Sequence, residues 1–197
     1  MFQLRTVPQY IKIKQLLERE ELGAIQRTSW VVTAWYRTEA YYASGGWRAT
    51  WKGEGGGVLL NQCPHNLDLF QWFCGKPKRV QAVCGFAKYH NIETEDDVTA
   101  FFEYPNGATG VFIASTGETP GTDRLEVTGD RGRLVYENGR ISVVRNEIGA
   151  SEFSRTATSG FARPEAWNIE VPVRDKSYGH EIVTQNFDVP CFGTREA

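Results

Sequence analysis

The feature that most constrains this fold is a succession of short β-rich segments. They lie at residues 80–89, 98–104, 108–115, 124–128, 133–136 and 141–144. Asn106-Gly107 and Asn138-Gly139 favour two-residue hairpin turns between them, and residues 129–132 form a slightly longer turn. Consecutive hairpins predict an antiparallel meander. Residues 167–173 could add another strand, and residues 148–164 have the composition of a loop.

The earlier part of the chain has the pattern of helices. Residues 8–20 place apolar side chains at a roughly 3.6-residue spacing, which predicts a short surface helix ending before Gly23. Residues 24–37 are rich in β-branched and aromatic side chains and favour a long strand. In residues 59–74, a stripe of apolar positions predicts a helix packed on a core and ended by Gly75. The stripe consists of Leu59, Cys63, Leu67, Phe70 and Cys74.

Helices followed by a run of hairpins predict an α+β fold, in which a predominantly antiparallel open sheet carries its helices on one face. The other face of such a sheet needs a partner. A chain of 197 residues fits one core, so residues 1–197 are expected to form one domain.

Charge and hydropathy exclude several classes of function. The formal net charge of −2 provides no basic field for a phosphate backbone, so nucleic-acid binding is not expected. No apolar run approaches the ~20 residues that span a bilayer, and the first residues lack the apolar core of a signal peptide. We therefore expect a cytoplasmic protein without membrane contact.

Metal binding is not expected either. The cysteines show no spacing suited to zinc, and we interpret them as reduced core thiols: Cys63, Cys74, Cys84 and Cys191. The histidines, His65, His90 and His180, are far apart in the sequence. The acidic residues Glu93, Glu95, Asp96 and Asp97 are expected to form a solvated turn before a strand.

Three polar residues of the helix expected at 59–74 could carry chemistry. Asn61, His65 and Asp68 are spaced by four and then three, which places them on one helical face opposite the apolar stripe. Imidazole exchanges protons near neutral pH, so His65 is a candidate acid or base. An exposed helix histidine capped by Asp68 explains the same spacing. Because proline is tolerated only near a helix start, Pro64 favours a helix beginning close to Leu60, with Asn61 in its first turn.

The segment before this helix, residues 38–57, mixes glycines with aromatic and basic side chains and is expected to be an ordered loop. Its aromatic and basic residues suit a polyhydroxylated ligand, and they could equally pack the loop down: Tyr41, Tyr42, Trp47, Arg48 and Trp51. Neither GxGxxG nor GxxxxGK[ST] occurs in the chain, so the glycines predict a tight turn rather than a phosphate site.

Three segments, YYASGGWRATW, GEGGGVLLNQCPHNLDLFQWFCGKPKRV and EDDVTAFFEYPNGATGVFIASTG, resemble the Gfo/Idh/MocA oxidoreductases, named for glucose-fructose oxidoreductase and inositol dehydrogenase. The resemblance runs over about residues 6–144. Its most specific element is the triple glycine, residues 55–57, followed by Asn61 and His65 in an Asp-or-Asn, x, x, x, His segment.

The resemblance implies that this chain is the C-terminal substrate-binding and oligomerisation domain, truncated at both ends. In the family, an N-terminal Rossmann domain binds NAD or NADP and supplies a catalytic lysine in a Glu-Lys-Pro segment. That domain, its fingerprint and that segment are absent here. The chain alone is therefore expected to bind no nicotinamide and to show no dehydrogenase activity.

By resemblance, His65 takes the catalytic histidine position and accepts or relays the proton of a substrate hydroxyl as hydride leaves to nicotinamide. Asn61 falls where many members have aspartate, and an amide can orient a hydroxyl but cannot take its proton. Tyr41, Trp47, Arg48 and Asp68 are the expected substrate-binding residues.

The expected substrate is a sugar, cyclitol or related polyol, and the open sheet face is expected to form a homodimer or tetramer. The alternative is a non-catalytic dimerisation or carbohydrate-binding module. A hydrolase or metal-dependent enzyme is a more distant possibility.

Overall fold

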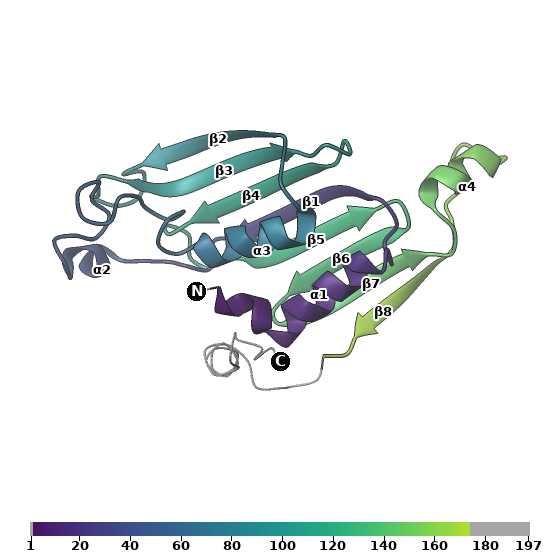
Figure 1. Ribbon diagram of the computed structural model, residues 1–197, viewed down its shortest axis with the longest axis horizontal. Coiled ribbons are helices and arrows are strands. Elements are labelled where there is room, and N and C mark those ends of the chain that lie inside the picture. Colours follow the sequence, from purple (N-terminus) through teal and green to yellow (C-terminus); the bar gives the residue numbers. More distant parts are fainter. Residues whose placement is uncertain (1, 174–197) are drawn as a thin grey trace, which may run out of the picture.

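The computed structural model describes residues 2–173, which form one eight-stranded sheet with helices (Figure 1). The helices are α1 (Pro8–Glu18), α2 (Glu39–Ala43), α3 (Pro64–Cys74) and α4 (Ala150–Thr156), preceded by a 3-10 turn at Gln3–Thr6. The strands are β1 (Ile25–Val32), β2 (Arg79–Phe86), β3 (Glu95–Glu103), β4 (Thr109–Ser115), β5 (Asp123–Gly129), β6 (Gly132–Glu137), β7 (Arg140–Asn146) and β8 (Ala166–Val171).

The strand order is β2-β3-β4-β1-β5-β6-β7-β8, and every pair is antiparallel except β1 and β4. The predicted open, mostly antiparallel sheet is therefore confirmed. The expectation of one continuous meander was wrong, because β1 inserts between β4 and β5. Strand β1 carries Trp30 and Val32, at most 1% exposed, so the central position buries these two large apolar side chains.

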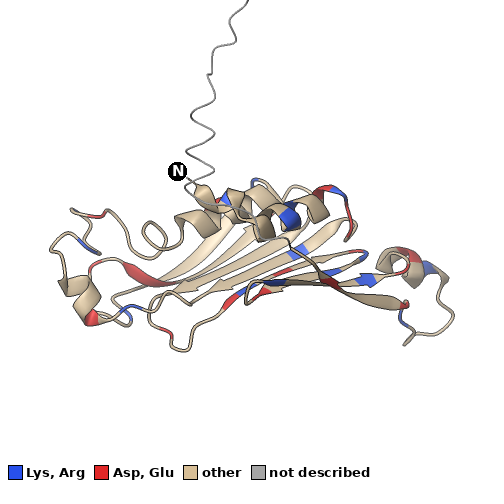
Figure 2. Cartoon of the chain, turned by 90° about the horizontal axis from the view of Figure 1, so that it is seen from below, with Lys and Arg blue, Asp and Glu red and all other residues tan. Residues whose placement is uncertain are grey.

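Helices α1 and α3 cover one face of the sheet and leave the other face bare (Figure 2). Trp30 of β1 packs against Phe73 of α3, with ring centroids 6.3 Å apart, and against Tyr10 of α1 at 6.1 Å. Tyr10 also contacts Tyr136 of β6 at 5.3 Å. Full burial of each large apolar side chain contributes about 1.5–3 kcal/mol, so these contacts fix α1 and α3 to the sheet.

The helix expected at residues 59–74 begins only at Pro64. Proline suits the first helical position because it has no N–H to leave unpaired, and its ring keeps the turn at residues 57–62 from continuing into the helix. The predicted core stripe was partly wrong for the same reason. Leu59, Leu67 and Cys74 are half-buried. The buried residues are Cys63, Asn66, Leu69, Phe70 and Phe73.

Two other boundaries differ from the sequence prediction. The strand expected at residues 24–37 ends at Val32, and the next residues follow an irregular path. Residues 38–57 and 148–164, predicted as loops, contain the short helices α2 and α4. These helices have five and seven residues, too few for a clear apolar period.

The bare face carries both apolar and charged side chains. Val83 of β2 is 76% exposed and Phe101 of β3 is 38% exposed. On the same face, Arg27 of β1 pairs with Glu126 of β5 at 2.5 Å. An exposed mixture of this kind leaves the face free to contact another molecule.

No helix within residues 2–173 has the length and apolar character needed to cross a membrane. In the same residues, Cys63, Cys74 and Cys84 are free thiols, and no group of three or more potential ligands is placed to hold a metal ion. Cys191 and His180 lie outside the described residues.

Candidate functional site

His65 lies in the first turn of α3, directly after Pro64. Its side chain is half-buried, and the ring of Phe2 meets it edge-on with centroids 5.8 Å apart. The Nδ1 atom is buried and has no hydrogen-bond partner among the described residues. A buried polar atom without a partner is costly, so packing alone does not explain this nitrogen.

The turn that leads into α3 is held by Glu95, the first residue of β3. Both carboxylate oxygens of Glu95 accept from the backbone N–H of Gly57 at 3.0 Å, and one accepts from Leu59 at 3.2 Å. A side chain at Gly57 would overlap the backbone of Glu95. The triple glycine therefore allows the chain to approach β3 closely and sets where α3 begins.

The expectation of a solvated acidic turn was wrong for two of its four residues. Glu95 is 7% exposed, and Asp96 is completely buried. Asp96 accepts from the backbone N–H groups of Lys88, Tyr89 and His90 at 2.8–3.1 Å. A run of acidic residues is normally exposed. The sequence therefore did not indicate that backbone N–H groups would surround the carboxylates of Glu95 and Asp96.

The loop at residues 38–57 is connected to the start of α3 through the hydroxyl of Tyr41. Arg48 Nη1 donates to this hydroxyl at 2.9 Å, and Gln62 Nε2 lies 3.4 Å from it. The Arg48 guanidinium also lies over the rings of Tyr41 and Trp47, at 4.5 and 4.7 Å. Figure 1 shows α2 at the same end of the sheet as the start of α3.

Gln62 was not predicted as a site residue. It is 7% exposed and lies three residues before His65, so it links the loop to the catalytic candidate. The only sign in the sequence that Gln62 could belong to the site is a polar residue on the buried side of a helix start.

Asn61 lies in the turn before α3 rather than on the helix, and it is exposed. The expected common helical face of Asn61, His65 and Asp68 was therefore wrong for Asn61. Its amide donates to Glu54, whose other carboxylate oxygen accepts from the backbone of Ala49 at 2.7 Å. Asn61 is thus tied to the loop that carries Trp47 and Arg48.

Asp68 lies one turn after His65 and forms a two-point ion pair with Arg5. The two N–O distances are 2.7 and 2.6 Å. This pair raises the pKa of Arg5 through the hydrogen bond to Asp68. Asp68 therefore anchors the segment before α1, and its expected role in substrate binding remains a prediction.

Cys63 precedes α3 and is fully buried. Burial raises the pKa of its thiol to about 12, and the nearby charge of Asp123 adds to the effect. The thiol stays protonated near neutral pH, so Cys63 is unsuited to nucleophilic chemistry. His65 remains the predicted acid-base group at this helix start.

The described residues do not form a Rossmann-type dinucleotide site. A Rossmann site needs consecutive parallel strands and a glycine-rich turn into a helix. Within residues 2–173, only β1 and β4 run parallel, and the antiparallel β2 and β3 lie between them in the sequence.

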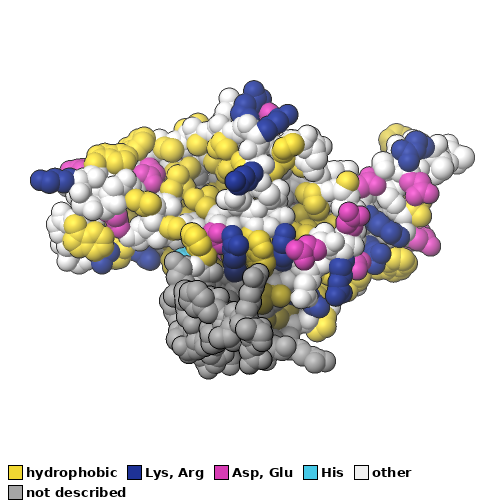
Figure 3. Space-filling model, in the orientation of Figure 1, with side chains coloured by type: hydrophobic (Ala, Val, Ile, Leu, Met, Phe, Trp, Pro, Cys, Tyr) yellow, Lys and Arg dark blue, Asp and Glu magenta, His cyan; other side chains and the backbone are white. Residues whose placement is uncertain are grey.

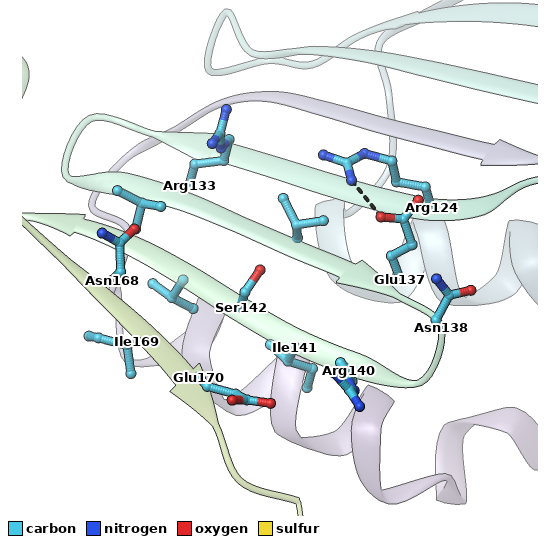
Figure 4. Close-up of a pocket in the computed structure, with 13 residues that line it drawn as sticks. Arg124, Arg133, Glu137, Asn138, Arg140, Ile141, Ser142, Asn168, Ile169 and Glu170 are labelled. Carbon is cyan, nitrogen blue, oxygen red and sulfur yellow. Dashed lines mark hydrogen bonds and ion pairs between the residues drawn. The ribbon is translucent and has the colours of Figure 1, made fainter.

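A wide, shallow hollow of about 860 Å³ lies on the bare face, over β6, β7 and β8 (Figure 4). Arg133, Ser142 and Asn168 project into it, beside an ion pair of 2.8 Å between Arg124 and Glu137. The hollow is on the opposite side of the sheet from α1 and α3, so it is separate from the His65 site.

Comparison with known proteins gives the same fold that the sequence predicted and the structure shows. The family description "GFO/IDH/MocA C-terminal domain" matches residues 10–135, and no curated protein matches the sequence. The WlbA dehydrogenase of Chromobacterium violaceum, solved with NADH and UDP-GlcNAcA, is 28% identical with a TM-score of 0.63. The match covers 68% of this chain and 39% of that one.

Two further solved structures are similar in fold. An NAD binding oxidoreductase from Klebsiella pneumoniae is 21% identical with a TM-score of 0.65, over 77% of this chain and 44% of that one. Levoglucosan dehydrogenase, solved with NADH and L-sorbose, is 18% identical with a TM-score of 0.65, over 86% and 46%. In each case the matched region is less than half of the longer protein. With the family match over more than half of its own length, this chain belongs to the GFO/IDH/MocA family of oxidoreductases and contains its C-terminal domain.

Proposed function

We propose that this chain is the substrate-binding and catalytic-histidine domain of an NAD(P)-dependent dehydrogenase that acts on a sugar, cyclitol or related polyol. The observation that carries the proposal is the His65 imidazole, which stands at the start of α3 with a buried Nδ1 that has no partner. The family match supports the same role, and two similar structures were solved with NADH and a sugar compound.

In this proposal, His65 takes the proton from the substrate hydroxyl that is oxidised. Proton transfer by a positioned imidazole typically accelerates such a step by about 10²–10⁴-fold. Asn61 can orient a substrate hydroxyl with its amide but cannot accept the proton. The acid-base work therefore rests on His65.

The substrate is bound between the start of α3 and the loop of residues 38–57. Tyr41, Trp47 and Arg48 present two aromatic rings and a guanidinium, which suit stacking and hydrogen bonding with a polyhydroxylated ring. Asp68, held by Arg5, borders the same helix face as His65. NAD or NADP would be held by a nucleotide-binding half outside the described residues, so the chain alone is expected to show no turnover.

The test compares variants in a protein that joins a nucleotide-binding half to this chain. His65→Ala should lower kcat by about 10² or more. Gln71→Ala, at an exposed position of the same helix, is the matched control and should leave kcat unchanged. Unchanged turnover in His65→Ala would remove His65 from the mechanism. Turnover of sugars or cyclitols by the chain alone with NAD or NADP would contradict the expectation that a separate nucleotide-binding half is required.

We further propose that the bare sheet face joins copies of this chain into a homodimer or tetramer. An open sheet needs cover for exposed apolar residues such as Val83 and Phe101. Light scattering at micromolar concentration should give a multiple of the monomer mass, and a monomer would contradict the proposal. The expected cytoplasmic location is retained as a prediction that cell fractionation would check.

The second candidate is a dimerisation or carbohydrate-binding module without redox chemistry. It rests on the absence of a Rossmann-type dinucleotide site from the described residues. Sugar binding without turnover, in a protein that does bind the nicotinamide, would favour this module over the dehydrogenase.

A further inference from the structure

Two arginines at the α2 end of the molecule each contact two aromatic rings. The Arg37 guanidinium is 5.6 Å from the ring of Trp35 and 4.9 Å from that of Tyr41. Arg48 lies over Tyr41, at 4.5 Å, and over Trp47, at 4.7 Å. Each cation therefore contacts two rings, and the Tyr41 ring is shared by both, in the order Trp35, Arg37, Tyr41, Arg48 and Trp47. We call these five residues the arginine–aromatic series.

Neither Arg37 nor Arg48 forms an ion pair within the part of the chain that the structure describes. Five other arginines in that part are each paired with a carboxylate: Arg5, Arg27, Arg79, Arg124 and Arg145. In addition, Arg37 Nε is buried and has no hydrogen-bond partner. Arg37 Nη1 donates to the carbonyl of Tyr36 at 3.0 Å, and Arg48 Nη1 donates to the Tyr41 hydroxyl at 2.9 Å, so each guanidinium has a neutral acceptor and no carboxylate. A half-buried guanidinium without a carboxylate partner is suited to a ligand that brings its own negative charge.

The carboxylates of the surrounding loops already accept backbone hydrogen bonds. Glu39 accepts from the N–H of Asn91 at 3.0 Å, and Glu93 accepts from that of Trp51 at 3.0 Å. Glu54 accepts from the N–H of Ala49. These acidic groups anchor the loop, and none of the three forms an ion pair with Arg37 or Arg48.

The series is held in place by the surrounding structure. The backbone N–H of Arg37 donates to the carbonyl of Thr116 at 2.9 Å, and its own carbonyl lies 3.0 Å from Nε2 of His90. The Tyr41 hydroxyl is held by Arg48 and Gln62. Figure 3 shows hydrophobic side chains beside basic ones at this end of the molecule. A positioned guanidinium binds an oxyanion with less loss of conformational entropy than a free one.

We propose that Arg37 and Arg48 bind a carboxylate or phosphate group on the sugar whose hydroxyl is oxidised at His65. The substrate is then an acidic sugar derivative rather than a neutral polyol. Guanidinium matches both oxyanions through paired N–H donors, and the flanking rings suit the apolar face of a sugar. This inference rests on the proposed function, because it places the anion and the reacting hydroxyl in one ligand.

The test is calorimetric titration of the full chain with matched neutral and acidic sugars. The probes are D-glucose with D-glucuronate, D-galactose with D-galacturonate, and the 1-phosphates of both sugars. At least one acidic member should bind about tenfold or more tightly than its neutral partner, which corresponds to about 1.4 kcal/mol. The two groups of acidic probes distinguish carboxylate binding from phosphate binding. A carboxylate site favours the uronates, and a phosphate site favours the 1-phosphates.

Arg37→Gln and Arg48→Gln should each weaken the acidic ligand about tenfold and remove its preference over the neutral sugar. Arg79→Gln is the control, because Arg79 is exposed on β2 and already paired with Glu103. If a glutamine variant fails to fold, Arg37→Lys and Arg48→Lys retain the charge, lose the paired donors and should still weaken binding. Equal affinity for neutral and acidic sugars, or no binding of any of them, overturns the proposal.

The same experiment separates this inference from the dehydrogenase proposal. His65→Ala should keep the preference for acidic over neutral sugars, because the anion contacts lie on another element and both sugars lose the same contact at His65. Tight acidic-sugar binding without turnover, in a protein with a nucleotide-binding half, would contradict the dehydrogenase and support the anion site. Faster turnover of neutral than of acidic sugars would contradict the anion site and support the dehydrogenase.

Discussion

The ring of His90 is held by the carboxylate of Asp96, with Nδ1 and Oδ2 3.0 Å apart. Both side chains are buried, and the ring of Tyr42 lies 4.8 Å away. Because Nε2 of the same histidine reaches the carbonyl of Arg37, this pair joins the β2–β3 connection to the segment that carries the arginine–aromatic series.

Asp96→Asn should destabilise the protein strongly. Asparagine has the same shape, but its amide cannot accept all the N–H groups that surround Asp96, and at least one donor is left unpaired in the interior. The expected loss is about 2–4 kcal/mol, measured by urea unfolding. Asp97→Asn, which breaks a partly exposed pair with Lys88, should cost less than about 1 kcal/mol. Equal losses would show that the buried network is unimportant.

Gly57→Ala should prevent the close approach of the α3 turn to β3. The added methyl group would overlap the backbone of Glu95, so the turn must shift and the hydrogen bonds to the Glu95 carboxylate are lost. We expect a loss of about 2–3 kcal/mol in the free energy of unfolding. Gly46→Ala is the control, since nothing lies within 4 Å of its added methyl group. A stable Gly57→Ala protein would contradict the role assigned to the triple glycine.

Tyr41→Phe should weaken sugar binding and leave the fold intact. The substitution keeps the ring beside Arg37 and Arg48 but removes the hydroxyl that joins Arg48 to Gln62. One hydrogen bond of this kind contributes about 1 kcal/mol, so affinity should fall about fivefold in the calorimetric titration. Tyr36→Phe, at a position 45% exposed, should not change affinity. A loss of thermal stability without a loss of affinity would make Tyr41 a packing residue.

Asp123 gives a pH dependence of stability with a definite sign. Burial raises the pKa of its carboxyl, opposed by the hydrogen bond from Trp30 Nε1 at 2.8 Å. The folded state therefore favours the protonated form. The stabilisation is complete below the unfolded pKa, about 3.9, and is lost as the pH rises through the folded pKa.

Asp123→Asn keeps an acceptor for Trp30 and carries no charge. Near pH 7, it should have a Tm a few degrees above that of the wild type, and the advantage should disappear below about pH 4. Thermal unfolding followed by circular dichroism between these limits measures the difference. Glu152→Gln, at an exposed position of α4, should show little difference at any pH. An advantage that grows on acidification would reverse the assigned sign.

Local pattern predicted most of the strands correctly. The strands β2 to β7 each lie within two or three residues of their predicted positions, because alternation and turn residues act between near neighbours. The position of β1 could not be predicted in this way. Its pairing with β4 and β5 depends on burying Trp30 against residues far away in the sequence.

The candidate site divides in the same manner. The sequence by itself determined the antiparallel hairpins, the histidine after a triple glycine and the aromatic loop before that histidine. Each of these features depends only on residues that are close together in the sequence. Only the tertiary structure decided that α3 starts at Pro64, that Glu95 and Asp96 are buried anchors, and that Gln62 joins the loop to the helix. The physical reason is that burial and hydrogen-bond satisfaction depend on which backbone groups the folded chain brings together, and no local pattern records those partners.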